Sequence, residues 1–238
     1  MQAKALVLDL INHDPIIFNN LQTYVDLVLE YNQKMNLTGF NDQTIWQEAI
    51  YQSIVLVDQV LKNQTNINLL DIGAGAGFPS IPYLIYAKNQ KIELTIIEAS
   101  LKRIKFLEIV KQQLNLKINL IHARAEATTD LKEQFDFITA RAVTSLKNLI
   151  EISCHLGKIN SQYFFLKSKK YQEEIQKAQS ILKILKINNL EVKAIDLNDQ
   201  KEHVLISYQK IPLEDVLMAS SRGGESVKNW ERMNVQIF

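Results

Sequence analysis

The stretch that decides the fold is Leu69-Leu70-Asp71-Ile72-Gly73-Ala74-Gly75-Ala76-Gly77-Phe78-Pro79. An apolar run from Ile67 to Ile72 predicts a buried strand, and it breaks into a turn where three glycines alternate with alanines before Pro79 opens a helix. Glycine is required where the backbone takes a positive φ or lies against a ligand without an intervening Cβ. The sequence therefore predicts a strand, a ligand-binding loop and a helix.

Two carboxylates indicate which ligand the loop binds. Dinucleotide sites use the spacing G-x-G-x-x-G with pyrophosphate at the helix start, whereas here the spacing is G-x-G-x-G and Asp71 stands two residues before Gly73. A carboxylate there disfavours phosphate and suits an ammonium group. Glu98 closes the next predicted strand about 20 residues after Gly77, where an acid usually binds ribose hydroxyls. This pattern resembles the first motif of the S-adenosylmethionine-dependent methyltransferases, although a tight glycine turn without a ligand remains the alternative.

Composition sets the limits of the protein class. The 238 residues are 47% hydrophobic and 22% charged, and a single cysteine, Cys154, excludes a disulfide framework and a cysteine-based metal cluster. The four histidines show no metal-ligand spacing, so no metal site is predicted. No apolar run is long enough for a membrane span and the first residues lack a signal pattern, so we expect a cytoplasmic protein without a membrane partner.

Charge is distributed unevenly along the chain. Residues 1–60 hold seven acidic residues against two lysines, whereas residues 158–186 hold seven lysines against two glutamates. A lysine cluster can bind nucleic-acid phosphates, or it can be a solvated helix face. Composition therefore permits a nucleic-acid partner without demonstrating one.

Hydrophobic periodicity predicts a helical extension followed by one α/β domain. Apolar residues recur every three or four positions along residues 16–35, and a second helix capped by Asp42 is expected to run to about Leu61, which makes residues 1–62 an N-terminal helical extension. Strands and helices then alternate over residues 63–210, the predicted methyltransferase domain, until two consecutive strands at 190–197 and 202–209 close the sheet. Residues 211–238 show no clear period and are expected to form a C-terminal tail.

Several polar segments follow the carboxyl ends of predicted strands. The helix after Glu98 is expected to bury a stripe that includes Leu101, Ile104 and Leu107, with basic residues at its start. Residues 122–126 follow a strand at 118–121, and residues 140–142 follow a strand at 135–139. In an open parallel sheet this edge binds ligands.

Five motifs in order resemble one family, the RsmG (glucose-inhibited division protein B) family of bacterial 16S ribosomal RNA methyltransferases. They are Met35-Asn36-Leu37-Thr38, the glycine loop, Glu98-Ala99-Ser100-Leu101-Lys102-Arg103 with Phe106-Leu107, Ala140-Arg141-Ala142-Val143-Thr144-Ser145-Leu146, and Phe164-Phe165-Leu166-Lys167. The resemblance covers about residues 16–210. It implies a seven-stranded, Rossmann-like class I fold, S-adenosylmethionine as cofactor, and methyl transfer to N7 of a guanine in 16S rRNA, as free RNA or within the 30S subunit.

The same resemblance implies roles for individual residues. The cofactor would be bound by Asp71, Gly73, Ala74, Gly75, Gly77 and Phe78 of the loop, by Glu98 at the ribose, and by Ala125 and Glu126 at the adenine edge. Arg141 would lie where the cofactor meets the target base and is the candidate catalytic residue, unless it forms a structural pair with Asp136 or an N-terminal carboxylate. Lys102, Arg103 and Lys167 would contact rRNA phosphates, and we expect a monomer.

The predicted chemistry needs no general base. Guanine N7 carries a free lone pair, so alignment with the methyl donor can supply most of the rate. The Asp/Asn-Pro-Pro-aromatic motif of adenine amino methyltransferases is replaced here by Thr139-Ala140-Arg141-Ala142. Cytosine C5 enzymes need a cysteine nucleophile, whereas Cys154 is predicted mid-helix, as a small buried residue.

Three segments depart from the family pattern. Glu48-Ala49-Ile50-Tyr51-Gln52-Ser53 stands where the family has Arg-His-x-x-Asp-Ser, Ser80 and Ser168 replace glycines, and residues 211–238 replace a short basic terminus. Two other functions stay open: a methyltransferase of the same fold acting on a small molecule or a protein, and a non-catalytic ribosome-binding module.

Overall fold

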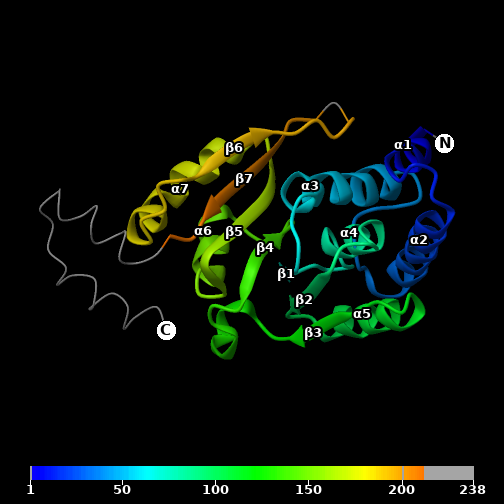
Figure 1. Ribbon diagram of the computed structural model, residues 1–238, viewed down its shortest axis with the longest axis horizontal. Coiled ribbons are helices and arrows are strands. Elements are labelled where there is room, and N and C mark those ends of the chain that lie inside the picture. Colours follow the sequence, from blue (N-terminus) through cyan, green and yellow to red (C-terminus); the bar gives the residue numbers. More distant parts are fainter. Residues whose placement is uncertain (1, 200, 212–238) are drawn as a thin grey trace, which may run out of the picture.

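The computed structural model describes residues 2–199 and 201–211, and Figure 1 shows their arrangement. Within these residues a seven-stranded sheet runs in the order β3-β2-β1-β4-β5-β7-β6. Its strands are β1 (Ile67–Ile72), β2 (Ile92–Glu98), β3 (Ile118–His122), β4 (Phe135–Ala140), β5 (Gly157–Ser168), β6 (Glu191–Ala194) and β7 (His203–Gln209). The strands β1 to β5 are parallel, and β7 is antiparallel to both β5 and β6. The seven-stranded sheet that the resemblance implies is confirmed.

Helices cover both faces of the sheet. On one face lie α1 (Gln2–Leu10), α2 (Pro15–Met35), α3 (Gln52–Leu61), α4 (Ser80–Tyr86) and α5 (Leu101–Gln113), and on the other lie α6 (Leu146–Ser153) and α7 (Tyr171–Ile184) (Figure 1). Because successive strand residues point to opposite faces, Leu69 joins the core on the α2 side and Leu70 joins the core beneath α6 and α7. The extension and the sheet share one hydrophobic core, so the division between residues 62 and 63 stays a prediction.

The extension places its longest helix against the glycine loop. Asp14 caps α2, because its Oδ1 accepts hydrogen bonds from the backbone N–H groups of Ile16 and Ile17. The buried stripe of α2 confirms the predicted periodicity and consists of Ile17, Leu21, Tyr24, Val25 and Val28. This stripe brings a tyrosine of the extension to the ligand edge of the domain.

The second helix of the extension begins later than predicted. The π-helix η1 (Ile45–Tyr51) precedes α3, so Asp42 is not its cap. The turn before η1 is instead organised by Asn41, whose Oδ1 accepts from the backbone N–H groups of Gln43 and Thr44. Asp42 lies inside that turn. The prediction that Asp42 caps the helix is wrong, because the side chain of Asn41 accepts the backbone hydrogen bonds of this turn.

Other boundaries differ in detail. Leu101, expected in the buried stripe of α5, is 49% exposed because it is the first residue of the helix and stands at the strand ends, whereas Ile104 and Leu107 are buried as predicted. The strand β6 is shorter than the expected strand at 190–197. The predicted tail from residue 212 onward lies outside the described residues. None of the described helices is long and apolar enough to cross a membrane.

Candidate active site at the carboxyl edge of the sheet

The glycine loop between β1 and α4 has the backbone that its sequence requires. Gly73, Gly75 and Gly77 have φ values of 66°, 63° and 109°. A Cβ at Gly75 would meet nothing within 4 Å, whereas a Cβ at Gly77 would lie 2.5 Å from Ile81 Cδ1 and 3.0 Å from the hydroxyl of Tyr24. Gly77 is therefore required by packing, and Gly75 borders open space that a ligand can use.

Glu98 joins the end of β2 to this loop. Its side chain is buried, its Oε2 accepts from the backbone N–H of Gly75 (N···O 3.0 Å), and its Oε1 accepts from the N–H of Ser100 (2.9 Å). Arg103 forms an ion pair with Glu98 at 3.7 Å, which occupies one of the three basic residues predicted to face RNA. The carboxylate is fixed beside Gly75, where it can also accept from a bound ligand.

Asp71 is fully buried at the end of β1. Its Oδ2 accepts from the backbone N–H of Ser80 (3.3 Å), and its Oδ1 has no hydrogen-bond partner among the described residues. Burial raises the pKa of Asp71 from 3.8 to about 8, and the hydrogen bond from Ser80 opposes that rise. A buried acceptor without a partner is costly, and an ammonium group of a ligand would relieve that cost.

The extension braces the loop from behind. The Tyr24 hydroxyl donates to the carbonyl of Ala76 (2.8 Å), and the Phe78 ring packs edge-on against the rings of Tyr24 and Phe40 at centroid distances of 5.7 Å each. Phe78 and Ala74 are consequently buried. Sequence reasoning did not assign Tyr24 or Phe40 to the site; the available signal was a hydroxyl within the apolar stripe of α2.

The predicted adenine edge lies after β3, in a short 3₁₀ turn, η2 (Ala125–Ala127). Ala125 is buried, and its carbonyl accepts from the Thr128 hydroxyl (2.7 Å). The side chain of Glu126 is 50% exposed and lies 3.8 Å from Arg124. This turn belongs to the same sheet edge as Glu98 and the glycine loop.

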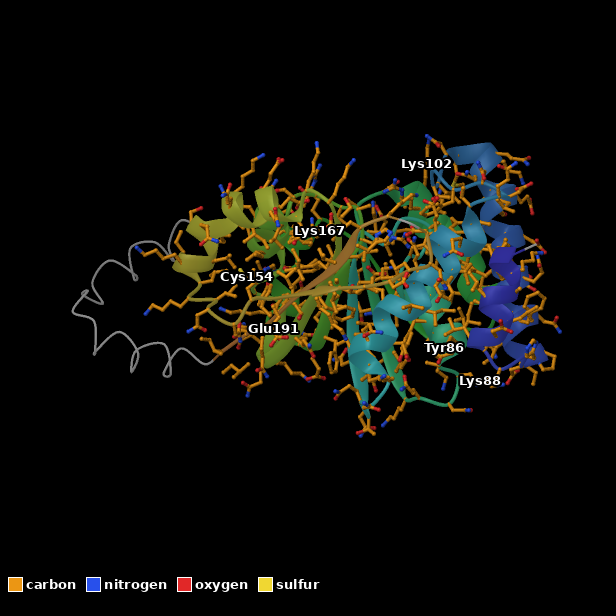
Figure 2. All side chains as sticks on the ribbon, turned by 90° about the horizontal axis from the view of Figure 1, so that it is seen from above. Tyr86, Lys88, Lys102, Cys154, Lys167 and Glu191 are labelled. Atoms are coloured by element: carbon orange, nitrogen blue, oxygen red, sulfur yellow. The ribbon has the colours of Figure 1, made fainter. Side chains whose placement is uncertain are left out.

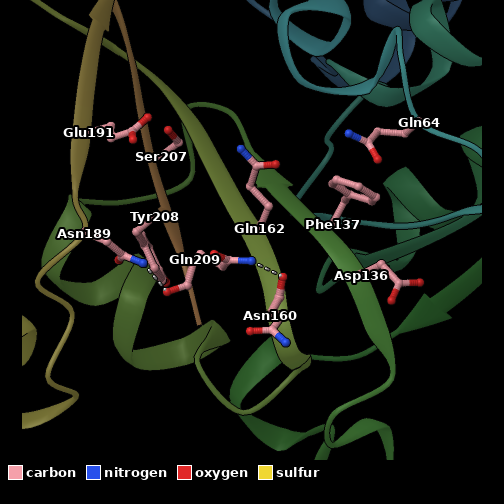
Figure 3. A pocket seen from close by; sticks show the side chains of 10 residues that line it. All are labelled: Gln64, Asp136, Phe137, Asn160, Gln162, Asn189, Glu191, Ser207, Tyr208 and Gln209. Carbon is pink, nitrogen blue, oxygen red and sulfur yellow. Dashed lines mark hydrogen bonds between the residues drawn. The ribbon is translucent and has the colours of Figure 1, made fainter. Parts of the chain in front are cut away.

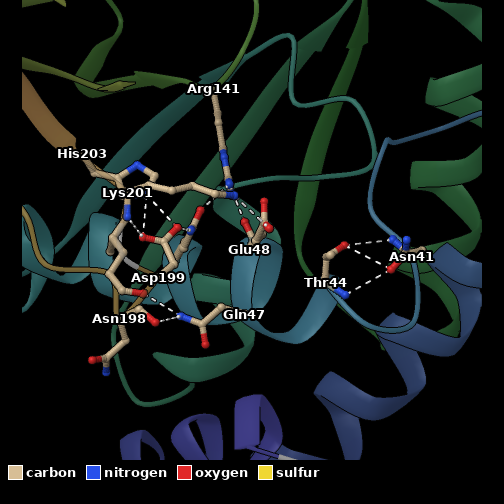
Figure 4. A network of polar contacts seen from close by, with 11 residues as sticks. Asn41, Thr44, Gln47, Glu48, Arg141, Asn198, Asp199, Lys201 and His203 are labelled. Atoms are coloured by element: carbon tan, nitrogen blue, oxygen red, sulfur yellow. Dashed lines mark hydrogen bonds and ion pairs between the residues drawn. The ribbon is translucent and has the colours of Figure 1, made fainter. Parts of the chain in front are cut away.

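Arg141, directly after β4, points at the extension. Its Nη2 donates to the Glu48 carbonyl and to Gln52 Oε1 (2.8 Å), and its Nη1 donates to the Ser53 hydroxyl (3.3 Å), as Figure 4 shows in part. The guanidinium carbon lies 5.4 Å from the centre of the Phe40 ring. Burial lowers the pKa of Arg141 from its ordinary value to about 10, and the nearby charge of Glu48 opposes this change. The guanidinium is held by neutral acceptors.

The alternative pairing of Arg141 with Asp136 does not form. Asp136 instead pairs with Lys158 at 2.8 Å. The Nε–H group and the second Nη1–H group of Arg141 take part in none of its three hydrogen bonds among the described residues.

The two predicted RNA-binding lysines lie on the same edge of the molecule in different surroundings (Figure 2). Lys102 is exposed at the start of α5. The Lys167 side chain is only 10% exposed, and its ammonium donates to the Thr144 carbonyl (3.0 Å) and to Glu174 Oε2 (2.7 Å). The ammonium group of Lys102 is therefore exposed to solvent, whereas that of Lys167 is paired with Glu174 inside the protein.

A separate hollow of about 440 Å³ opens on the sheet away from these residues (Figure 3). Its walls are mostly amides and carboxylates, including Asp136, Gln162, Glu191 and Gln209. It contains none of the predicted site residues. No group of three or more His, Cys, Asp or Glu in the described part of the chain could hold a metal ion.

These features fit S-adenosylmethionine. The open position at Gly75, the fixed carboxylate of Glu98 and the unpaired Oδ1 of Asp71 lie on one sheet edge. They offer space for a ligand, an acceptor for hydroxyl groups and an acceptor for an ammonium group, which are the needs of a nucleoside that carries an amino acid.

Solved structures share the fold at low sequence identity. A putative class I S-adenosylmethionine-dependent methyltransferase from Listeria monocytogenes superposes with a TM-score of 0.57 at 15% identity, over 82% of this chain and 69% of that one. This likeness agrees with the order of the seven strands and, at this identity, concerns the fold alone.

Sequence relatives are much closer. A protein of Mycoplasmopsis pulmonis named ribosomal RNA small subunit methyltransferase G is 43% identical over 81% of this chain and 84% of its own length. A protein of the same name from Mycoplasma mobile is 39% identical, over 76% of this chain and 83% of its own length. The model of the family described as rRNA small subunit methyltransferase G (GidB) matches residues 17–205. The family suggested by the five motifs is confirmed: the chain belongs to the rRNA small subunit methyltransferase G family and is an S-adenosylmethionine-dependent methyltransferase.

Proposed function

We propose that this protein transfers a methyl group from S-adenosylmethionine to N7 of a guanine in 16S ribosomal RNA. The observation that carries the proposal is the glycine loop, where Gly75 borders open space beside the fixed carboxylate of Glu98. The family adds the substrate class, because its curated relatives are named for methylation of small-subunit rRNA. The partner is 16S rRNA or the 30S subunit, in the cytoplasm, and the enzyme acts as a monomer.

Binding of the cofactor falls to the end of β1 and the end of β2. When bound, S-adenosylmethionine supplies an electrophilic methyl group on a sulfonium. Gly75 would let the backbone approach it, Gly73 and Gly77 would keep the turn around it, Asp71 Oδ1 would accept from its ammonium group, and Glu98 would accept from its ribose hydroxyls. Ala125 and Glu126 border its adenine, while Ala74 and Phe78 act from the core by keeping the loop in shape.

Alignment of the target base falls to Arg141. Guanine N7 has a free lone pair, so no residue has to remove a proton before attack, and orientation is the main contribution of the protein. Arg141 is held on one side by residues of the extension, and its Nε–H and second Nη1–H groups take part in none of the hydrogen bonds it forms among the described residues. These two donors can orient an oxygen of the guanine or the carboxylate of the cofactor.

RNA phosphates would be bound at the same edge by Lys102, Arg103 and Lys167. The exposure of Lys102 favours it as the strongest contact of the three. Arg103 and Lys167 already pair with Glu98 and Glu174, so each would have to share its charge with RNA.

Calorimetry combined with a methyl-transfer assay tests the function. Wild-type protein should bind S-adenosylmethionine and S-adenosylhomocysteine, and should transfer a labelled methyl group to guanine N7 in 30S subunits that lack the modification. Gly75→Asp is a suitable control, because aspartate tolerates a left-handed backbone better than most residues and its side chain would fill the open space beside Glu98.

The outcomes separate the candidate functions. Binding without transfer to 30S subunits or free 16S rRNA would point to a small-molecule or protein substrate. Absence of binding would point to a non-catalytic ribosome-binding module.

A further inference from the structure

A partly buried cation held by neutral groups is unusual, and Arg141 is such a cation. Among the described residues, its three hydrogen bonds go to a carbonyl, an amide and a hydroxyl of residues 48–53, and none goes to a carboxylate. Burial already lowers the pKa of Arg141, which shows that its charge is poorly solvated. The charges of Glu48 and Asp71 act on the guanidinium without a hydrogen bond from it to either carboxylate, so a further carboxylate linked to it through hydrogen bonds would stabilise it in this position.

Gln52 lies between the Arg141 guanidinium and the carboxylate of Asp199. The side chain of Gln52 is 2% exposed, its Oε1 accepts from Arg141 Nη2 (2.8 Å), and its Nε2 donates to Asp199 Oδ2 (2.9 Å). A guanidinium has only donors and a carboxylate has only acceptors. An amide is therefore the side chain that can satisfy both neighbours at once, and its orientation is fixed by them.

Asp199 belongs to the loop between β6 and β7, and it is itself held in place. His203 Nε2 lies 2.8 Å from Asp199 Oδ2, the side chains of both residues are at most 10% exposed, and the backbone N–H of Lys201 donates to Asp199 Oδ1 (3.2 Å) (Figure 4). A chain of contacts thus runs from His203 through Asp199 and Gln52 to Arg141.

The same loop is attached to η1 at a second point. Gln47 Nε2 donates to the Leu197 carbonyl (2.6 Å), and Lys201 pairs with Glu48 at 3.0 Å (Figure 4). Gln47 docks the loop without a hydrogen bond to Arg141. It therefore provides a control for the docking of the loop alone.

We propose that Gln52 and Asp199 are positioning residues that hold the Arg141 guanidinium in its productive orientation, so that the β6–β7 loop buttresses the active site. This inference rests on the proposed function, because it assumes that Arg141 orients the cofactor or the target base. Gln52 stands where the family pattern has an aspartate, and Asp199 places a carboxylate against the other end of the Gln52 amide.

A charge-swap experiment on the full chain tests the proposal. Gln52→Glu places two carboxylates against each other, and Asp199→Asn removes the charge from the chain of contacts. The double variant, Gln52→Glu with Asp199→Asn, restores one carboxylate and one amide in exchanged positions. Displacement of an orienting group costs up to about 100-fold in rate, so we expect kcat to fall about tenfold or more in Gln52→Glu and severalfold in Asp199→Asn. The double variant should return to within about threefold of wild type.

Two further variants separate positioning from a purely structural role. Gln52→Ala and Gln47→Ala should lower the melting temperature similarly, but only Gln52→Ala should lower kcat by about tenfold, with the Kd for S-adenosylmethionine changed less than kcat. In an Arg141→Lys background, Gln52→Ala should cause at most about a twofold further loss, because both changes act through one group.

Contrary results are equally distinct. A double variant no better than Gln52→Glu, or a Gln47→Ala enzyme as slow as Gln52→Ala, would overturn the positioning role while the wild type remains active. A wild type that transfers no methyl group to 30S subunits would instead overturn the proposed function, and this inference with it.

Discussion

The two halves of the carboxyl edge are built differently. Around β1 and β2, polar groups find partners within 23 residues, since Glu98 accepts from Gly75 and Ser100, and Asp71 accepts from Ser80. Around β4, Arg141 finds its partners 88 to 93 residues earlier in the chain. The first half is a local motif that carries its own geometry. The second half exists only after the extension and the β6–β7 loop have folded against the sheet.

Substitution of the loop glycines should have the largest effects. We expect Gly77→Ala to lower the free energy of unfolding by about 3 kcal/mol, because it combines a positive φ with a collision against Ile81 and Tyr24. Gly75→Ala should cost only about 1 kcal/mol, since its Cβ enters open space. Urea unfolding measures both values, and equal losses would contradict the distinction between a packing glycine and a ligand glycine.

Asp71 should make the stability of the first half depend on pH. Its folded pKa of about 8 lies above the ordinary 3.8, so between these values the folded protein holds a proton that the unfolded chain has lost. The contribution of this group to stability is therefore fully present below about pH 4 and is lost as the pH rises to about 8.

Asp71→Asn removes that dependence. Relative to wild type, the variant should gain on the order of 2 kcal/mol in unfolding free energy between pH 5 and pH 8, as measured by urea unfolding at each pH. A constant difference between the two proteins would show that the Asp71 carboxyl is already ionised at pH 5.

Variants of Glu98 and Arg103 test whether the fixed carboxylate binds the cofactor. Glu98→Gln puts an NH₂ group against the N–H of either Gly75 or Ser100, so we expect about a tenfold weaker Kd for S-adenosylmethionine by calorimetry. Arg103→Gln removes the ion pair with Glu98 but leaves both N–H bonds, and should weaken binding about twofold or less. Equal effects would mean that the charge of the pair, and not the fixed carboxylate, matters for binding.

Substitution of the lysines should have the smallest effects. Loss of Lys102 should weaken RNA binding, and loss of Lys167 should lower stability. Lys102→Met should weaken binding to 30S subunits about threefold and reduce its salt dependence, because an exposed phosphate contact is lost. Lys167→Met should lower the free energy of unfolding by about 1 kcal/mol, since Glu174 and the Thr144 carbonyl lose their donor. If Lys167→Met reduced RNA binding more than Lys102→Met, then Lys167 and not Lys102 would be the main RNA contact of the two.

Local pattern explains why most of the fold could be predicted. The bounds of β1 and β2 were predicted as the structure has them, because an apolar run that ends in a glycine turn or at an acid carries its own signal. The unexpected start of η1 had no such signal, since the side chains of Asn41 and Asp42 compete for the same turn and the sequence does not show which one bonds the backbone.

The sequence by itself determined the sheet, the glycine loop, the acids at the ends of β1 and β2, and the family, because each depends on residues that are neighbours in the chain. Only the tertiary structure decided the directions of individual side chains: Leu101 outward, Phe78 inward, Lys167 onto Glu174 and Arg141 onto Gln52. A side chain at the end of a strand points toward whichever element packs beside it. That element is fixed by burial of distant apolar surface, which no local pattern records.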